Sequence, residues 1–126
     1  MLAVGEHSLG GVSAREMKMA SMFAGGLAGT RQELCGAISA GAMVVGVLYG
    51  RTRPGEDEVL ARQFVARYRE RFLAEFGTTQ CAPIRERYEV PGKTGFCAPV
   101  AERAAVILLG VLSELCLGGP RIQPPG

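Results

Sequence analysis

Apolar positions recur with a helical period through the second half of the chain. Five of them lie four residues apart, namely Leu60, Phe64, Tyr68, Phe72 and Phe76. Because residues four apart share one face of an α-helix, this pattern predicts an amphipathic helix over about 60–76. Arginines lie mostly on its other faces, and Gly77 is placed to end the helix.

Other segments predict further helices. Ser13–Glu16 and Thr30–Glu33 have the spacing of a capping box, so we expect one helix up to about Ala24 and another from about Arg31 to Gly50. A short helical turn is expected over 83–88 and a final helix over about 99–117, while VPGKTG (90–95) is expected to be a loop.

No segment shows the alternation expected of a β-strand. The predicted fold is therefore all-α: a small bundle of about four to five helices joined by short loops. With 126 residues, the chain is predicted to be a single domain, 1–126, with a disordered tail at 118–126.

Composition excludes several classes of partner. The formal net charge is only +2, arginine and glutamate are interleaved, and tryptophan is absent, so neither nucleic acid nor an anionic membrane is expected. The longest apolar run, 34–49, is shorter than the roughly 20 residues that span a bilayer. With no secretory signal in the opening residues, a cytoplasmic location is expected, where the four cysteines are more often reduced, redox-active or metal-bound than paired structurally.

Small residues line one side of the apolar run at spacings of up to five positions, namely Gly36, Ala37, Ala40, Gly41 and Gly46. Glycine inside a helix costs up to about 1 kcal/mol relative to alanine. Several such positions predict a compensating close approach, either by another helix or by a cofactor.

The tripeptide Cys-Ala-Pro occurs twice, at Cys81 and Cys97. Proline is tolerated in the first turn of a helix, so both cysteines are predicted at or next to helix N-termini, where the helix dipole favours thiolate. Cys35 is expected one turn into its helix. The three thiols would converge if these helices packed with their starts together; the alternative is that each cysteine is simply a small apolar residue.

Three segments together resemble the C_GCAxxG_C_C family, small helical proteins of bacteria and archaea to which redox activity is ascribed. They are FAGGLAGTRQELCGAISAGAMVVGVLYGR, FGTTQC and GFCAPVAERAA, and the resemblance extends from about Leu2 to Leu115. Cys35, Cys81 and Cys97 match three of the four family cysteines. The fourth, expected in an N-terminal helix near an Asn-Cys-Ala stretch, has no counterpart, and Ala40 stands where the motif closes with glycine.

The resemblance implies redox or metal chemistry at Cys35, Cys81 and Cys97, with Gly36 and Ala37 beside a cofactor. A [2Fe-2S] cluster is the natural candidate for clustered thiolates, and it would need one more ligand; zinc, or no metal, is the other expectation. Cys116 lies outside the pattern, about 28 Å from Cys97 along a helix, and is not expected to complete the site.

A second hypothesis belongs to a different class of protein. A helical homodimer, with the small-residue helix packed against its symmetry mate, would have cysteines that are structural or zinc-bound. The sequence identifies neither a redox partner nor a catalytic acid or base, so whether the protein is an enzyme stays open.

Overall fold

Six helices form within the residues that the structure describes. The structure is a computed structural model that describes residues 2–88 and 97–118, without the side chains of residues 2–3 and 116–118. The helices are α1 (Leu2–Leu9), α2 (Ala14–Ser21), α3 (Gly36–Tyr49), α4 (Val59–Phe76), α5 (Cys81–Tyr88) and α6 (Ala98–Gly118). Within these residues the only β-type pairing is one isolated bridge, between Leu34 and Gln80. The all-α prediction is confirmed.

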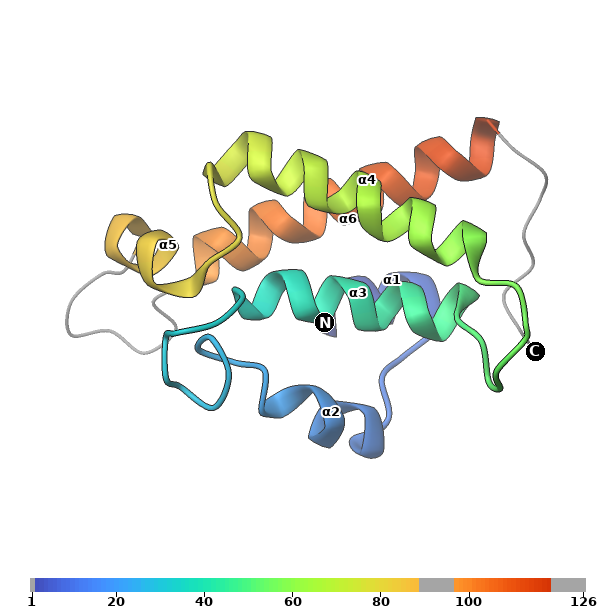
Figure 1. Cartoon of the computed structure of the whole chain (residues 1–126), viewed down its shortest axis with the longest axis horizontal. Helices are drawn as coiled ribbons and strands as arrows, with labels where there is room; N and C mark the ends of the chain where they lie inside the picture. The colour runs from blue at the N-terminus through green and yellow to red at the C-terminus, as the bar shows by residue number, and fades with distance from the viewer. Residues whose placement is uncertain (1, 89–96, 119–126) are drawn as a thin grey trace.

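The helices pack around a core shared by α3, α4 and α6, each of which contacts the other two. Figure 1 shows α4 and α6 on one side of α3 and α2 on the other. The largest fully buried side chains are aromatic residues of α4 and valines of α3 and α6, namely Tyr68, Phe64, Phe72, Phe76, Val44, Val45, Val100 and Val111.

The most regular predictions are confirmed. Helix α4 buries the aromatic residues that recur every four positions, and Gly77 ends it with a left-handed φ of 74° while donating its N–H to the Leu73 carbonyl at 2.8 Å. Ser13 caps α2 as expected: its hydroxyl accepts the Glu16 N–H at 3.1 Å, and the Glu16 carboxylate accepts the Ser13 N–H at 2.8 Å. Helix α6 lies close to its predicted range.

Helix α1 was not predicted from the sequence. Its segment LAVGEHSL contains a glycine and polar residues and shows no clear helical period. It is stabilised by contacts with α3 and α6, and Val4 is buried in the common core. Tertiary packing therefore supplies what the local pattern lacks.

The second predicted capping box is wrong. Helix α3 begins at Gly36 rather than near Arg31, and Thr30 donates its hydroxyl to the Gly26 carbonyl at 2.9 Å instead of capping a helix. Arg31 has a left-handed φ of 63°, which no helix start allows. Backbone groups of 33–35 bond to 79–81 instead, so they are not available to a helical turn.

Two remaining predictions concern loops and ends. Helix α5 begins at Cys81, two residues before the predicted start. The VPGKTG loop (90–95) and nearly all of the predicted tail, 119–126, lie outside the described residues.

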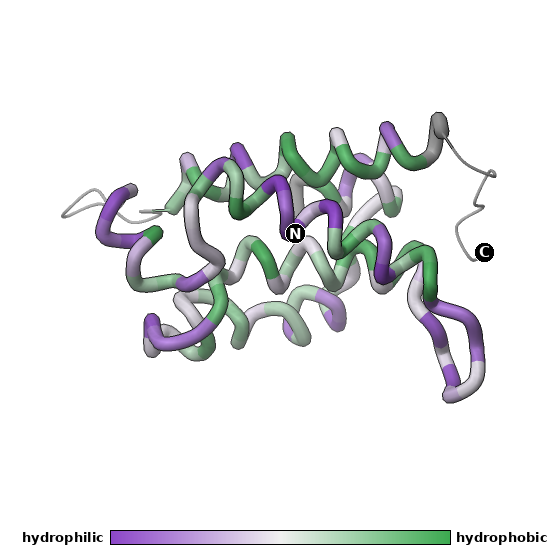
Figure 2. The backbone as a smooth tube through the Cα atoms, turned by 45° about the horizontal axis from the view of Figure 1, so that its top comes forward, coloured by the Kyte–Doolittle hydropathy of each residue, from purple (hydrophilic) through white to green (hydrophobic). Residues whose placement is uncertain are grey.

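Figure 2 shows that the loop between α3 and α4 is hydrophilic, and an Arg53–Glu56 ion pair of 2.9 Å lies within it. No helix among the described residues has the length and apolarity to cross a bilayer.

Candidate functional site: three thiols on one cavity

Each of the three matched cysteines lies at the start of a helix. Cys35 is the N-cap of α3, Cys81 is the first residue of α5, and Cys97 directly precedes α6, where its carbonyl accepts the Ala101 N–H at 2.9 Å. The prediction for the two Cys-Ala-Pro segments is confirmed. The placement of Cys35 one turn into its helix is wrong, because α3 starts later than predicted. The N-terminal ends of α3, α5 and α6 lie at the same end of the bundle (Figure 1).

Backbone hydrogen bonds fix Cys35 beside Cys81. The Cys35 N–H donates to the Thr79 carbonyl at 2.8 Å, and the Cys81 N–H donates to the Glu33 carbonyl at 3.0 Å. These two bonds flank the Leu34–Gln80 bridge and join the segment before α3 to the segment before α5. Two cysteines that are 46 positions apart in sequence are thereby held next to each other.

The glycine-rich loop after α2 packs against the thiols through its backbone. Residues 25–29 all have positive φ, between 51° and 75°, as in one left-handed turn. A Cβ on Gly26 would lie 2.6 Å from the Cys81 Cβ, and a Cβ on Gly36 would lie 3.2 Å from the Phe23 carbonyl oxygen. Only glycine allows Gly26 both this conformation and this approach.

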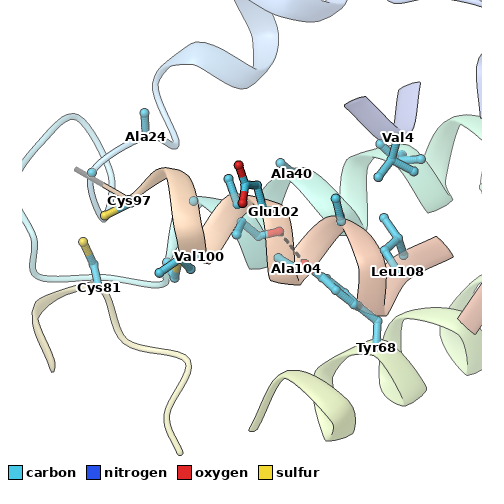
Figure 3. A pocket seen from close by; sticks show the side chains of 18 of the residues that line it. Val4, Ala24, Ala40, Tyr68, Cys81, Cys97, Val100, Glu102, Ala104 and Leu108 are labelled. Atoms are coloured by element: carbon cyan, nitrogen blue, oxygen red, sulfur yellow. Dashed lines mark hydrogen bonds between the residues drawn. The ribbon is translucent and has the colours of Figure 1, made fainter. Parts of the chain in front are cut away.

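The three thiols line one cavity of about 660 Å³. Figure 3 shows the sulfur atoms of Cys81 and Cys97 directed toward the same end of it. Elsewhere the wall consists mainly of small and aliphatic residues of α3 and α6, with Val4 of α1, Met17 of α2 and Tyr68 of α4. Cys35 and Cys81 are buried, whereas Cys97 is partly exposed, and all three are present as thiols.

The thiols influence one another electrostatically. Burial raises the pKa of Cys35, and charge on Cys81 or Cys97 raises it further. The backbone N–H groups of Ala37 and Ile38, at the start of α3, lower the pKa of the same thiol but do not outweigh burial. Cys35 is therefore protonated at neutral pH.

The small-residue face of α3 is covered by the same chain at two points. Tyr68 of α4 lies over Gly41, where a Cβ would be 2.3 Å from its Cε2 atom, and it donates its hydroxyl to the Ala37 carbonyl at 2.8 Å. The expectation that another helix lies against this face is confirmed at Gly41. Burial raises the pKa of Tyr68, so this hydroxyl keeps its proton.

Two residues of the site were missed in the sequence. Arg85 lines the cavity. It lies four residues after Cys81, so a helix that begins at Cys81 carries both side chains on one face, and the correct start of α5 would have indicated Arg85. Tyr68 was recognised only as a core residue. Its role as a cavity wall and hydrogen-bond donor depends on how α4 crosses α3, for which the sequence carries no local signal.

The site does not form a ready-made metal centre. In the part of the chain that the structure describes, no three His, Cys, Asp or Glu side chains are placed so that they could hold one metal ion. The three sulfurs share a cavity without forming a ligand set. A metal site on these three sulfurs would need a different arrangement of their side chains.

The fold and site define a small all-α protein with a three-thiol centre at converging helix starts. The chain belongs to the C_GCAxxG_C_C family, described as "Putative redox-active protein (C_GCAxxG_C_C)", which it matches over residues 1–111. No curated protein and no solved structure matches it.

Proposed function

We propose that the protein transfers two electrons by thiol–disulfide exchange, with Cys81 and Cys97 as the exchanging pair and Cys35 beside them. The observation that carries this proposal is the shared cavity, toward one end of which both sulfur atoms are directed (Figure 3). Both cysteines lie at the starts of helices. Membership of a family described as redox-active supports the same assignment.

The exchange begins at Cys97, because it is the most accessible of the three sulfurs. Its thiolate attacks the disulfide of a partner molecule, forming a mixed disulfide and releasing one partner thiol. The Cys81 sulfur then attacks the Cys97 sulfur, so that a Cys81–Cys97 bond forms and the second partner thiol leaves. Two protein thiols lose two electrons and two protons in total, and one partner disulfide becomes two thiols.

A thiol count before and after oxidation tests this proposal. The denatured, reduced chain has four thiols. After brief treatment with the thiol oxidant diamide at low protein concentration, the monomer should contain two, and reduction with dithiothreitol should restore four. The Cys81→Ser and Cys97→Ser variants should lose no thiols on oxidation, and the control variant Cys116→Ser should still lose two thiols. Oxidation that leaves all four thiols titratable would contradict the proposal.

A [2Fe-2S] cluster or zinc on Cys35, Cys81 and Cys97, beside Gly36 and Ala37, is a second proposal. It is supported by the soft donor set on one cavity and opposed by the lack of a preformed ligand geometry. Iron, zinc and acid-labile sulfide, measured after anaerobic purification, distinguish the cases. Iron and sulfide near two per chain support the cluster, stoichiometric zinc supports a zinc site, and their absence leaves thiol exchange.

A homodimer is also proposed, on different grounds from those of the sequence. Three apolar side chains that are close together in the sequence are exposed on the surface. They are Met19, Met22 and Phe23, with exposed fractions of 61%, 62% and 41%. Such a patch is a common interface feature. Sedimentation of the wild type and of a Met19→Lys/Met22→Lys variant tests it: a dimer that the variant converts to a monomer supports the proposal, and a monomeric wild type contradicts it.

A further inference from the structure

The thiol-lined cavity continues well beyond the sulfurs, and we infer that it binds an uncharged, largely apolar organic molecule, of about the size of a two- or three-ring aromatic compound. Ligand cavities in proteins range from about 300 to 1,000 Å³. At about 660 Å³ this cavity lies within that range, and it is far larger than three thiols need for exchange among themselves. The inference goes beyond thiol exchange and does not depend on it.

The space exists because both helices that flank it carry small side chains. Ala37 and Ala40 of α3 face the cavity together with Ala101, Ala104 and Ala105 of α6. Further along the same helices, Val45 and Val111 are fully buried, so the core there is closed by larger residues. The cavity is therefore a local feature of one end of the bundle rather than loose packing throughout.

The lining selects against charged ligands. Apart from the thiols, its wall is formed by alanine, glycine, valine, leucine and methionine, with Tyr68 at one side. Arg85 and Glu102 are its only charged residues among those the structure describes, and their charges are opposite. Tyr68 already donates its hydroxyl hydrogen to Ala37. Burying an ionised group against the apolar part of the wall would cost several kcal/mol.

The ligand would lie in contact with the sulfurs. Cys35, Cys81 and Cys97 line the same cavity as Val4 and Leu108. In Figure 3 the labelled sulfurs lie at one end, and Tyr68, Val4 and Leu108 lie toward the other. A molecule that lies along the cavity from its apolar end to the sulfurs would limit the access of outside reagents to the thiols.

Binding of N-phenyl-1-naphthylamine tests the inference. This uncharged three-ring probe fluoresces strongly in apolar surroundings, and we expect reduced wild-type protein to bind one molecule per chain. Ala40→Leu and Ala101→Leu fill the cavity from α3 and α6 at positions that are not fully buried, so the fold should be retained. Each should weaken binding at least tenfold.

Ala74→Leu is the matched control, because Ala74 is an exposed residue of α4 that does not line the cavity. It should leave the affinity for the probe unchanged within twofold. Circular dichroism of all three variants confirms that they are folded. A wild type that binds no probe, or equal affinity in the cavity-filling variants and the control, would overturn the inference.

Alkylation gives a second readout at the sulfurs. Saturating probe should slow the reaction of Cys97 with N-ethylmaleimide several-fold in the wild type and leave it unchanged in Ala40→Leu. Probe binding should persist in Cys97→Ser, which cannot carry out the exchange. Loss of disulfide formation with probe binding intact would count against thiol exchange alone, whereas intact disulfide formation without probe binding would count against the cavity inference alone.

Discussion

Gly41 and Gly46 lie five residues apart in α3, yet their surroundings differ completely. A Cβ at Gly41 would meet the Tyr68 ring at 2.3 Å, whereas a Cβ at Gly46 would have no atom within 4 Å. Gly41→Ala should therefore destabilise the protein by about 1–3 kcal/mol through overpacking. Gly46→Ala should stabilise it by up to about 1 kcal/mol, because alanine favours the helix.

Urea unfolding of the two variants beside the wild type measures both effects. Because each variant adds one methyl group to the same helix, the pair separates close packing from helix propensity. Equal changes in the free energy of unfolding for Gly41→Ala and Gly46→Ala would show that Tyr68 does not pack closely against Gly41.

Cys35 gives the stability of the protein a defined pH dependence. Burial raises its pKa above the ordinary value of 9.0, so the folded chain keeps this proton where the unfolded chain releases it. The stabilisation from this group is fully present below about pH 9 and is lost as pH rises through the raised pKa. Between pH 8 and 10.5, under reducing conditions, unfolding free energy should fall more steeply in the wild type than in Cys35→Ala.

The difference in slope is limited to about 1.4 kcal/mol per pH unit, the value for one proton. Denaturant unfolding at a series of pH values measures it. Identical slopes in the two proteins would show that Cys35 is not desolvated in the folded state.

Helix α2 is held weakly. It has no buried residue, and its capping box is the main local device that orders it. Ser13→Ala should remove about 0.5–2 kcal/mol of local stability. We expect amide hydrogen exchange over residues 14–21 to accelerate several-fold, while exchange in α4, the control element, stays unchanged. Equal acceleration in both helices would mean that α2 unfolds only with the whole molecule.

For the molecule as a whole, apolar packing between helices matters more than the ion pairs on its surface. Phe72 of α4 is fully buried, whereas the nearby Arg103–Glu75 pair between α6 and α4 is exposed to solvent at 2.9 Å. Phe72→Ala should lower the unfolding free energy by about 3–5 kcal/mol. Glu75→Gln should lower it by less than about 1 kcal/mol. Thermal denaturation of both variants compares them, and a larger effect at Glu75 would contradict this ranking.

Much of this architecture could be predicted from sequence because it depends on local periodicity and local helix-capping signals. Helix α4, the Ser13 cap and the two Cys-Ala-Pro helix starts depend on neighbours within a few residues. The start of α3 could not be predicted, because long-range bonds between 33–35 and 79–81 replace the helical turn that Thr30–Glu33 suggested. The cavity and the place of Tyr68 in its wall depend in the same way on how the helices pack.

Cys81 and Cys97 line one cavity, and in the proposed function they exchange electrons as a pair. Mass-spectrometric mapping of tryptic peptides, after mild oxidation and alkylation of the remaining thiols, tests it most directly. We predict one reversible cross-link, joining the peptide of Cys81 to the peptide of Cys97, with Cys35 and Cys116 alkylated. Four alkylated cysteines, or a main cross-link that involves Cys35 or Cys116, would contradict this pairing.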